Sequence, residues 1–256
     1  MIKIENISKK FGDKIVLDDI SAHFVQGKCN LIIGASGSGK TVLIKCMVDL
    51  IQADKGKILF ENINLGSMNK EERKDLRHNI GMLFQGNALF DSMTVEENVK
   101  FPLDMFSNLL ETEKLDKVNK MLARVNLTGA NDKYPAEISG GMKKRVGLAR
   151  ALVLNPKYLF CDEPNSGLDP QTSMVIDKLI HELTIEYNIT TIVVTHDMNS
   201  VMEIGDKIIY LHQGKKEWEG SKKDIIYCQN ELLNNFIFAS DFLQDAKEKR
   251  MMDTKL

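Results

Sequence analysis

Residues 34–41 read GASGSGKT, which fits the pattern G-x-x-x-x-G-K-[ST]. An apolar run, Leu31–Ile33, leads into this stretch, and a segment with amphipathic spacing, Thr41–Leu50, follows it. Glycines in such a turn let backbone N–H groups point inward around a polyphosphate, and the start of the next helix adds the positive end of its dipole. The sequence therefore predicts a phosphate-binding loop. The alternative is a glycine-rich turn with a surface lysine, but that alternative would leave the flanking strand and helix unexplained.

This loop predicts separate tasks for its last two residues. Lys40 is expected to reach the β- and γ-phosphates of a nucleotide, and the hydroxyl of Thr41 is expected to ligate Mg²⁺. The rest of the loop is expected to surround the phosphates with backbone N–H groups. Those residues are Gly34, Ala35, Ser36, Gly37, Ser38 and Gly39.

Carboxylates suited to a metal and to an attacking water follow a second apolar run. Tyr158–Cys161 continues directly into Asp162 and Glu163. Adjacent strand residues point to opposite faces, so Asp162 can face Mg²⁺ while Glu163 faces the water as a general base. Two buried carboxylates without a cation would repel each other, which favours a metal. The alternative is an acidic helix-capping pair before Pro164. Together with the phosphate-binding loop, Asp162 and Glu163 predict a P-loop nucleotide hydrolase.

The composition is that of an ordinary globular protein. The 256 residues carry a formal net charge of −2, with 27% charged and 43% hydrophobic residues. This balance argues against a basic surface that binds nucleic acid. No apolar run approaches the ~18 residues that cross a bilayer. The four cysteines lie far apart without a C-x-x-C pair, so neither structural zinc nor a disulfide framework is expected.

Strand-like and helical segments alternate along the chain, which predicts an α/β fold. Alternating and extended patterns predict an antiparallel N-terminal β subdomain at 2–7 and 15–24. Short, almost wholly apolar runs predict parallel strands covered on both faces, at 29–33, 79–84, 158–162 and 190–195. A closing hairpin is expected where Gly214 follows 208–212.

Helical spacing occupies the long stretch without strand signals. It predicts helices at 95–106, 113–125 and 141–154, in a helical subdomain inserted at about 86–155. The main domain is expected to span 1–220 and a C-terminal helical extension 221–256. The extension could pack on its own domain, embrace a partner copy or bind a small accessory protein. Its apolar side chains include Phe236, Phe238, Phe242 and Leu243.

A second glycine motif opens one of these helices. Ser139 can cap the helix and Gly140-Gly141 permits close backbone approach, which suggests a second phosphate-binding element, with a simple capped helix as the alternative. The stretch ISGGM at 138–142 resembles the LSGGQ signature of ATP-binding cassette (ABC) ATPases, with Met142 in place of the usual glutamine. The resemblance implies a two-fold dimer in which each signature closes on the ATP of the other chain. The following residues, 143–145, are expected to form a solvated helix face.

Further motifs resemble ABC elements in the same order. Phe11 stands where an aromatic stacks on adenine, and Gln85 resembles the Q-loop glutamine that senses Mg²⁺ and the membrane partner. His196 resembles the switch histidine that contacts the γ-phosphate, although a strand-end histidine can also be structural. The stretch that resembles the D-loop at the dimer seam consists of Ser166, Gly167, Leu168 and Asp169.

The resemblance covers residues 1 to about 220 and implies an ATPase with a RecA-like parallel sheet that uses ATP and Mg²⁺. The implied catalytic residues are Lys40, Glu163 and His196. The implied metal ligands are Thr41, Gln85 and Asp162.

Local features resemble one subgroup of the family. Met142, the segment 85–103 and the helical tail look like the ATPase subunit of Mla-type (Mkl-like) phospholipid transporters. Asn165 departs from the threonine usual after Glu-Pro. The resemblance implies a location on the cytoplasmic face of the inner membrane, peripheral through MlaE-like permeases. Implied partners are a second copy, two permeases, MCE-domain lipid-binding proteins and, in some systems, a STAS-domain protein.

Other interpretations stay open. The chain could be the ATPase subunit of an importer of a small solute such as an amino acid. It could also be an ABC ATPase that acts away from membranes, in translation or DNA repair, or a regulator that binds nucleotide without hydrolysing it. A permease helix is expected to dock near 85–101, in a groove whose apolar residues could equally be subdomain core. Those residues are Leu89, Phe90, Met93, Phe101 and Met105.

Overall fold

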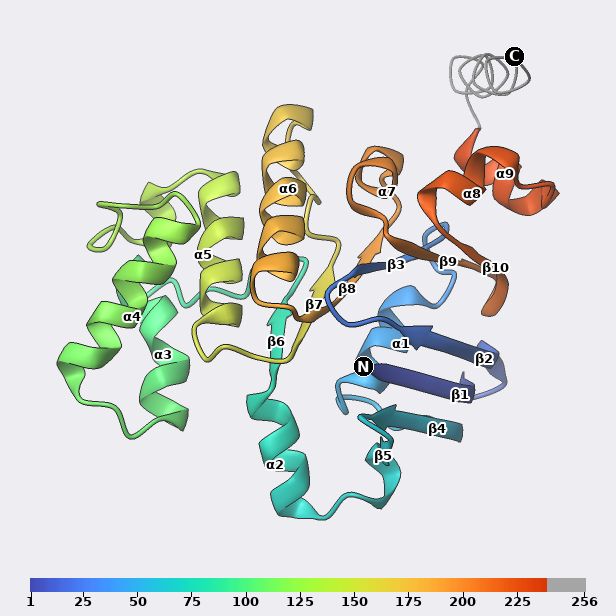
Figure 1. Cartoon of the computed structure of the whole chain (residues 1–256), viewed down its shortest axis with the longest axis horizontal. Coiled ribbons are helices and arrows are strands. Elements are labelled where there is room, and N and C mark those ends of the chain that lie inside the picture. Colours follow the sequence, from blue (N-terminus) through green and yellow to red (C-terminus); the bar gives the residue numbers. More distant parts are fainter. Residues whose placement is uncertain (239–256) are drawn as a thin grey trace. The chain divides into compact units, whose positions relative to one another are not determined.

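In the computed structural model, which describes residues 1–238, the N-terminal residues form an antiparallel sheet (Figure 1). Its strand order is β2-β1-β4-β5. The alternation in β1 puts Ile2, Ile4 and Ile7 in the core and polar residues on the other face, which confirms the predicted half-exposed strand. The four strands are β1 (Ile2–Phe11), β2 (Lys14–Phe24), β4 (Lys55–Phe60) and β5 (Ile63–Asn64).

The chain divides into two compact units by its internal contacts. The first unit contains Met1–Val25, Cys29–Ser67 and the chain from Val194 onward. The second contains Gln26–Lys28 and Met68–Val193. Within residues 1–238, no helix is long and apolar enough to cross a membrane.

The first unit also contains a parallel strand pair and the predicted hairpin. β3 (Cys29–Ile33) is buried throughout and runs parallel to β9 (Lys207–His212). β9 turns back antiparallel into β10 (Lys215–Gly220), as the closing-hairpin prediction requires. The helical elements of the unit are α1 (Lys40–Met47), η1 (Leu65–Ser67), α7 (Met198–Ile204), α8 (Lys222–Tyr227) and α9 (Glu231–Ile237).

The helical tail packs on its own unit as far as it is described. The ring of Phe236 stacks on Tyr210 of β9 at 5.3 Å between centroids, and the Tyr210 hydroxyl donates to the Leu232 carbonyl at 3.3 Å. Leu233 and Ile237 are buried. Of the three roles considered for the tail, this part therefore favours self-packing. The predicted apolar residues Phe242 and Leu243 lie outside the described residues.

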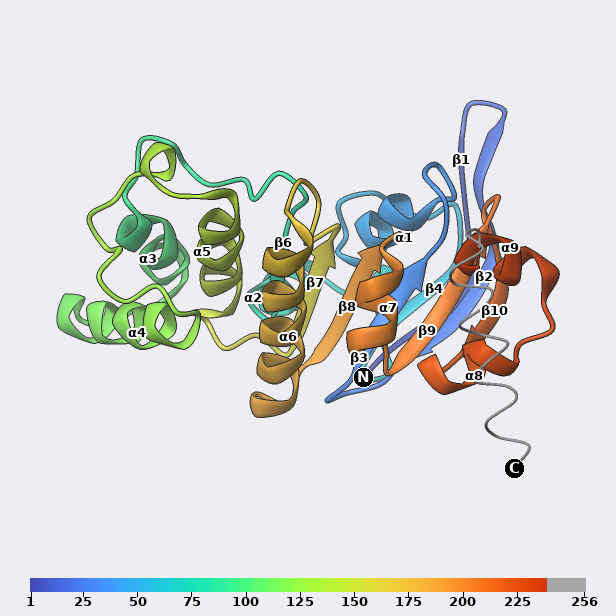
Figure 2. The same ribbon diagram turned by 90° about the horizontal axis from the view of Figure 1, so that it is seen from above.

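The second unit combines buried strands with a group of helices. β6 (Ile80–Leu83) runs parallel to β7 (Tyr158–Asp162). β8 (Thr190–Thr195) follows β7 in the sheet order, and its residues up to Val193 belong to this unit. β7 and β8 are buried at every position, which confirms the covered strands. Helices α3, α4 and α5 lie side by side in both views (Figures 1 and 2). The helical elements are α2 (Lys70–His78), α3 (Val95–Phe106), α4 (Glu111–Arg124), η2 (Pro135–Glu137), α5 (Gly140–Leu152) and α6 (Pro170–Glu186).

Candidate functional site

The phosphate-binding loop joins β3 to α1, as the motif predicts. A Cβ atom on Gly34 would lie 2.2 Å from the Leu211 carbonyl oxygen, and one on Gly39 would lie 2.7 Å from the Val16 carbonyl oxygen. Gly39 also has φ = 103°, in the left-handed region. Both positions therefore require glycine, because any side chain would collide with the neighbouring backbone. The fold itself therefore explains the glycines at 34 and 39.

Lys40 lies inside its own loop. Its side chain is buried, with 6% of the residue exposed, and Nζ donates to the carbonyls of Gly34 at 2.7 Å and Ala35 at 3.0 Å. These two bonds hold the ammonium group over the turn of the loop. Ser38 presents the opposite case: its hydroxyl is buried and finds no hydrogen-bond partner among the described residues. A buried hydroxyl without a partner fits a ligand that supplies the missing bond.

A pocket of about 440 Å³ lies beside this loop in the first unit. Gly39 caps α1 without a side-chain hydrogen bond, so no side chain of the cap competes with an anion for the first N–H groups. The pocket, the buried Ser38 hydroxyl and the uncapped helix start fit a nucleoside triphosphate. Its lining consists of Lys14, Ile15, Val16, Gly37, Gly39, Lys40, Thr41, Val42, Gln213 and Gly214.

Phe11, expected to stack on adenine, does not line this pocket. It ends β1 with 49% of its surface exposed, and Lys9 Nζ lies 5.4 Å from its ring centroid. Val42 of α1 lines the pocket, and so do Ile15 and Val16 at the start of the next strand. Sequence reasoning missed these two residues because an aliphatic pair at a strand start carries no specific signal.

The carboxylates Asp162 and Glu163 differ in environment, as the strand-end prediction expects. Asp162 ends β7 and is 6% exposed, whereas Glu163 is half-buried. Glu163 has φ = 49°, although it is not glycine and precedes Pro164. The Ser166 N–H donates to the Glu163 carbonyl at 3.1 Å and closes this turn. A left-handed glutamate costs on the order of 1–3 kcal/mol, and such strain clusters at functional sites.

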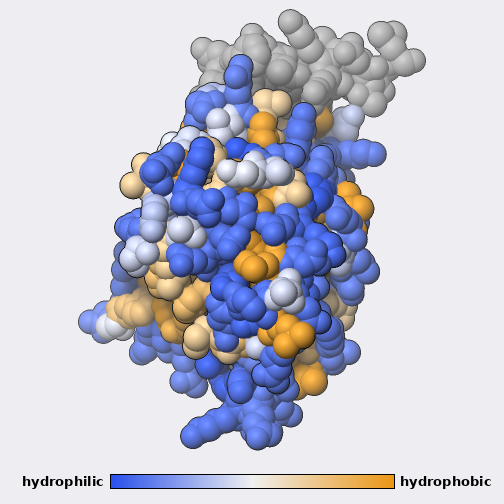
Figure 3. Space-filling view, turned by 90° about the vertical axis from the view of Figure 1, so that its left-hand side faces the viewer, coloured by the Kyte–Doolittle hydropathy of each residue, from blue (hydrophilic) through white to orange (hydrophobic). Residues whose placement is uncertain are grey.

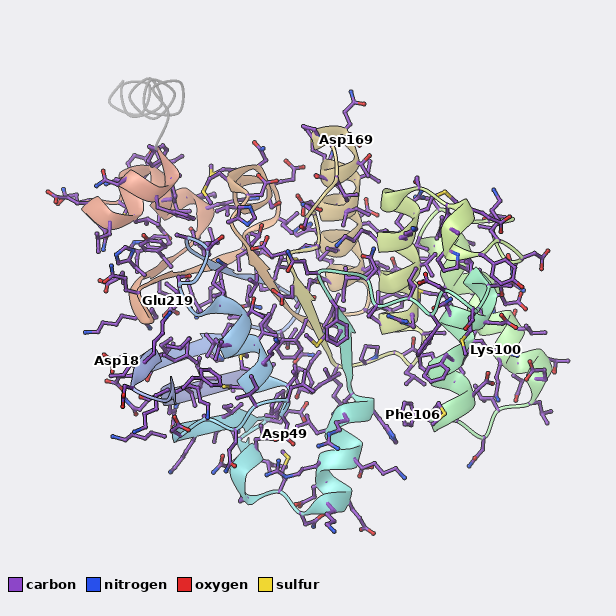
Figure 4. The ribbon with its side chains drawn as sticks, turned by 180° about the vertical axis from the view of Figure 1, so that it is seen from behind. Asp18, Asp49, Lys100, Phe106, Asp169 and Glu219 are labelled. Atoms are coloured by element: carbon purple, nitrogen blue, oxygen red, sulfur yellow. The ribbon has the colours of Figure 1, made fainter. Side chains whose placement is uncertain are left out.

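Gln85 and the D-loop are in contact within the second unit. Gln85 follows β6, is exposed, and its Nε2 donates to the Ser166 hydroxyl at 3.4 Å. Asp169, labelled in Figure 4 at the start of α6, caps that helix by accepting from the Thr172 N–H at 3.0 Å. A bond from the Thr172 hydroxyl lowers the pKa of the Asp169 carboxyl, because it favours the ionised form. The structure therefore brings together two of the predicted loops.

The signature begins α5 as predicted. The Ser139 hydroxyl caps the helix by accepting from the Met142 N–H at 3.2 Å. A Cβ atom on Gly140 would meet a Leu168 methyl carbon at 3.5 Å, and one on Gly141 would lie 2.5 Å from the methyl of Thr172. The second glycine therefore permits the close approach of α6, whatever its role toward a phosphate.

The expected solvated face at 143–145 is wrong for Lys144. This residue is only 2% exposed, and its Nζ donates to the Gln85 carbonyl at 2.6 Å. Arg145 donates to the Asn126 carbonyl at 2.6 Å. A helix stripe could have revealed the burial, since Lys144 shares the face of Gly141 and Leu148, three and four residues away. Lysines are mostly exposed, and that general tendency misled the prediction.

His196 directly follows β8 and is exposed. The next residue, Asp197, caps α7 by accepting from the Asn199 N–H at 2.8 Å, and its own N–H bonds to the Thr195 hydroxyl at 3.0 Å. These bonds fix the backbone on either side of the histidine. His196 and the phosphate-binding loop belong to the first unit, and Gln85, the carboxylates, the signature and the D-loop to the second.

The predicted metal ligands have suitable chemistry for Mg²⁺. A hydroxyl, an amide oxygen and a carboxylate, from Thr41, Gln85 and Asp162, are hard oxygen donors. Such donors suit Mg²⁺, which keeps several waters and is usually held by one or two carboxylates together with substrate phosphates. Among the described residues no group of three or more His, Cys, Asp or Glu side chains could hold a metal.

Comparisons with known proteins agree with these motifs. A family model described as "ABC transporter" matches residues 17–166. The methionine import ATP-binding protein MetN of Campylobacter jejuni is 37% identical over 261 residues, covering 96% of this chain and 78% of MetN. The probable ribonucleotide transport ATP-binding protein mkl of Mycobacterium tuberculosis is 34% identical, covering 92% of this chain and 66% of that protein.

Solved structures match as well. The dimeric bacterial ABC transporter cassette MJ0796 has a TM-score of 0.79 and 31% identity, covering 87% of this chain and 99% of that one. The same cassette was solved as a dimer in a post-hydrolysis state with ADP and Pi, with a TM-score of 0.78. The cbiO1 structure of Clostridium perfringens, part of the complex cbiONQ, has a TM-score of 0.81 and covers 90% of this chain.

Proposed function

This chain belongs to the ABC transporter family, and from that premise we propose that it drives a membrane permease by forming an ATP-sandwich dimer. As a member of the family it is an ATPase that uses ATP with Mg²⁺. The observation that carries the proposal is the signature helix: one chain needs one phosphate-binding loop, and Ser139-Gly140-Gly141 adds a second candidate. A two-fold dimer gives that second element a ligand, the ATP held by the partner copy.

The roles proposed for the residues follow from their chemistry. Lys40 balances the charge of the β- and γ-phosphates, and Glu163 takes the proton of the attacking water. His196 contacts the γ-phosphate. Thr41, Gln85 and Asp162 hold Mg²⁺, which when bound neutralises phosphate charge. The strained backbone of Glu163 supports a fixed carboxylate at this position.

The dimer seam is proposed to consist of the signature and the D-loop. Gly140 and Gly141 lie against Leu168 and Thr172, so these two segments form one surface in the second unit. The cassette MJ0796 was solved as a dimer, which supports a dimer of this chain.

A groove of about 640 Å³ in the second unit is the proposed docking site for the permease. Phe90 and Phe101 line it, with ring centroids 4.9 Å apart, whereas Leu89, Met93 and Met105 do not. Phe106, at the end of α3 and labelled in Figure 4, also lines the groove. The face around the helices is mainly hydrophilic with separate hydrophobic patches (Figure 3). The basic lining residues are Lys74, Arg77 and Arg150.

Asn98 holds the groove's aromatic segment in place. It is fully buried, accepts from the Phe90 N–H at 2.9 Å and donates to the Phe90 carbonyl at 3.1 Å. Phe90 itself remains 40% exposed. An aromatic side chain fixed at its backbone and open to solvent is well suited to anchor a partner helix.

Phe90→Ala is expected to reduce coupled transport by about tenfold or more while the ATPase activity of the isolated subunit stays intact. The reason is that an aromatic side chain buried in an interface contributes on the order of 2 kcal/mol to binding. Transport by the reconstituted permease complex and phosphate release by the isolated chain measure the two effects. Leu110→Ala is the control, since Leu110 is 70% exposed outside the groove. Loss of both activities in Phe90→Ala would indicate a folding defect and contradict the docking role.

Phospholipid is the cargo we propose, moved between membranes of the cell envelope. Met142 in the signature and the segment 85–103 support this choice, because both resemble Mla-type ATPases. The chain would then act at the cytoplasmic face of the inner membrane, attached through MlaE-like permeases. MCE-domain proteins and, in some systems, a STAS-domain protein would complete the complex.

Import of a small solute such as an amino acid is the second candidate. The methionine importer subunit MetN is 37% identical to this chain, which favours solute import as directly as the local motifs favour lipid. Purification of the native membrane complex is expected to recover an MCE-domain protein with this chain. Recovery of an external solute receptor with the permease would support the importer and contradict the lipid proposal.

A further inference from the structure

Lys144 is a buried cation that forms no ion pair with any of the described residues. It lies in α5 with 2% of its surface exposed, and within residues 1–238 its single hydrogen bond is to the Gln85 carbonyl, at 2.6 Å. Burial lowers the pKa of its ammonium group, and the nearby Cys161, Glu163 and Asp162 partly offset this effect. A buried charge is costly unless it is well paired. The cost of burying this charge suggests that Lys144 does more than fill space.

Arg150 makes the same kind of contact further along the helix. Its guanidinium donates to the carbonyls of Asn87 and Ala88, both at 2.8 Å. Asn87 has φ = 63° and Ala88 has φ = 49°, so two successive residues other than glycine are left-handed. Such a pair is unfavourable and persists only when its surroundings hold it. The planar fork of an arginine can bind two neighbouring carbonyls at once.

Gly147 sits between these two basic residues on α5. A Cβ atom there would lie 2.8 Å from a Leu83 methyl carbon and 3.8 Å from the Asn87 carbonyl oxygen. The helix therefore approaches the end of β6 and the following loop closely. Because the helix lies so close, Lys144 and Arg150 together donate to three carbonyls of one loop, those of Gln85, Asn87 and Ala88.

We propose that Lys144 and Arg150 form a clamp that fixes the Q-loop, residues 85–88, to the signature helix α5. Both are positioning residues: they touch the loop backbone, and Gln85 in turn carries the amide proposed to meet Mg²⁺. A shift of the Q-loop on permease binding would then move the signature helix with it. The clamp stands on the contacts above, whereas its consequence for hydrolysis rests on the proposed function.

Hydrogen exchange of the full chain tests the clamp without any need for activity. Lys144→Met removes the donor but keeps an apolar side chain of similar length, and the Gln85 carbonyl, in an exposed residue, can bond to water. Amides in residues 85–90 are expected to exchange about tenfold faster, because a hydrogen bond to a charged group contributes about that factor or more. Lys144→Arg, which retains a donor, is expected to exchange like the wild type.

A lysine outside the loop contacts provides the control. The side chain of Lys120, in α4, is exposed and pairs with Asp116. Lys120→Met removes this charge and should leave the exchange of amides 85–90 unchanged. The thermal unfolding midpoint of each variant shows that it has folded. Unchanged exchange at 85–90 in folded Lys144→Met would overturn the clamp, even if the chain hydrolyses ATP as proposed.

The Mg²⁺ dependence of turnover tests the positioning role. In Lys144→Met the Mg²⁺ concentration for half-maximal ATP hydrolysis is expected to rise several-fold, and Lys144→Arg should restore it. A merely structural lysine would change stability without changing the Mg²⁺ requirement. An unchanged requirement together with faster exchange would overturn the positioning role. Absence of turnover in the wild type would count against the proposed function instead, and the exchange result would still decide the clamp.

Discussion

Lys40→Met is expected to weaken ATP binding by at least about 100-fold. Each hydrogen bond from a charged donor contributes about 1.5–3 kcal/mol, and the ammonium group is proposed to serve two phosphates at once. The substitution also removes the bonds to the carbonyls of Gly34 and Ala35, which hold the loop in shape. Titration of the purified chain with ATP, followed calorimetrically, measures the change.

The controls for this variant separate charge from folding. Lys45→Met changes a lysine in the last turn of the same helix and is expected to bind ATP within about twofold of the wild type. Lys40→Arg keeps the charge but replaces a compact ammonium with a planar fork, and it too should bind weakly in this tight loop. Wild-type affinity in Lys40→Met would show that the loop does not hold phosphate as proposed.

Glu163→Gln is expected to reduce ATP turnover by 10²–10⁴-fold, the usual contribution of a general base. The amide has nearly the shape of the carboxylate but cannot accept the proton of the attacking water. Nucleotide binding should persist, because Glu163 is not among the residues proposed to hold the phosphates or Mg²⁺. Phosphate release at saturating Mg²⁺ and ATP, together with the ATP affinity, measures both effects.

A matched control is available in the same unit. Glu71 is exposed in the first turn of α2, and Glu71→Gln is expected to keep wild-type turnover. Normal hydrolysis by Glu163→Gln would exclude this carboxylate as the base. A loss of ATP binding in the same variant would instead place Glu163 among the ligand contacts.

The sequence was most informative where a single local rule decided the structure. Gly34 and Gly39 are required by close backbone contacts, and Ser139 caps its helix as its position before Gly140 predicts. The covered strands β3, β7 and β8 follow from their apolar runs. In each case the signal lies within a few neighbouring residues, so no knowledge of distant contacts is needed.

Elements that depend on distant partners escaped prediction. β4 begins with Lys55-Gly56-Lys57, which resembles a loop, yet it pairs with β1. A Cβ atom on Gly56 would lie 2.4 Å from the Glu5 carbonyl oxygen, so the glycine permits that pairing. Helix α2 buries only Leu76, and its one clear signal was the capping box formed by Asn69 and Glu72.

The candidate site shows the same division. Motifs indicated which residues carry phosphate, metal and proton chemistry, but not how the backbone holds them. The left-handed conformation of Glu163 and the bond from buried Lys144 to the Q-loop arise from tertiary packing. Phe11 likewise occupied the expected place in sequence without lining the pocket.

The central claim is that two copies of this chain close on ATP. The mass of Glu163→Gln in solution, measured by light scattering with and without ATP and Mg²⁺, tests it most directly, because this variant should bind ATP and hydrolyse it too slowly to reopen. The account predicts a shift from the 29.0 kDa single chain to twice that mass on addition of ATP. A chain that binds ATP fully and keeps the single-chain mass would contradict the sandwich dimer.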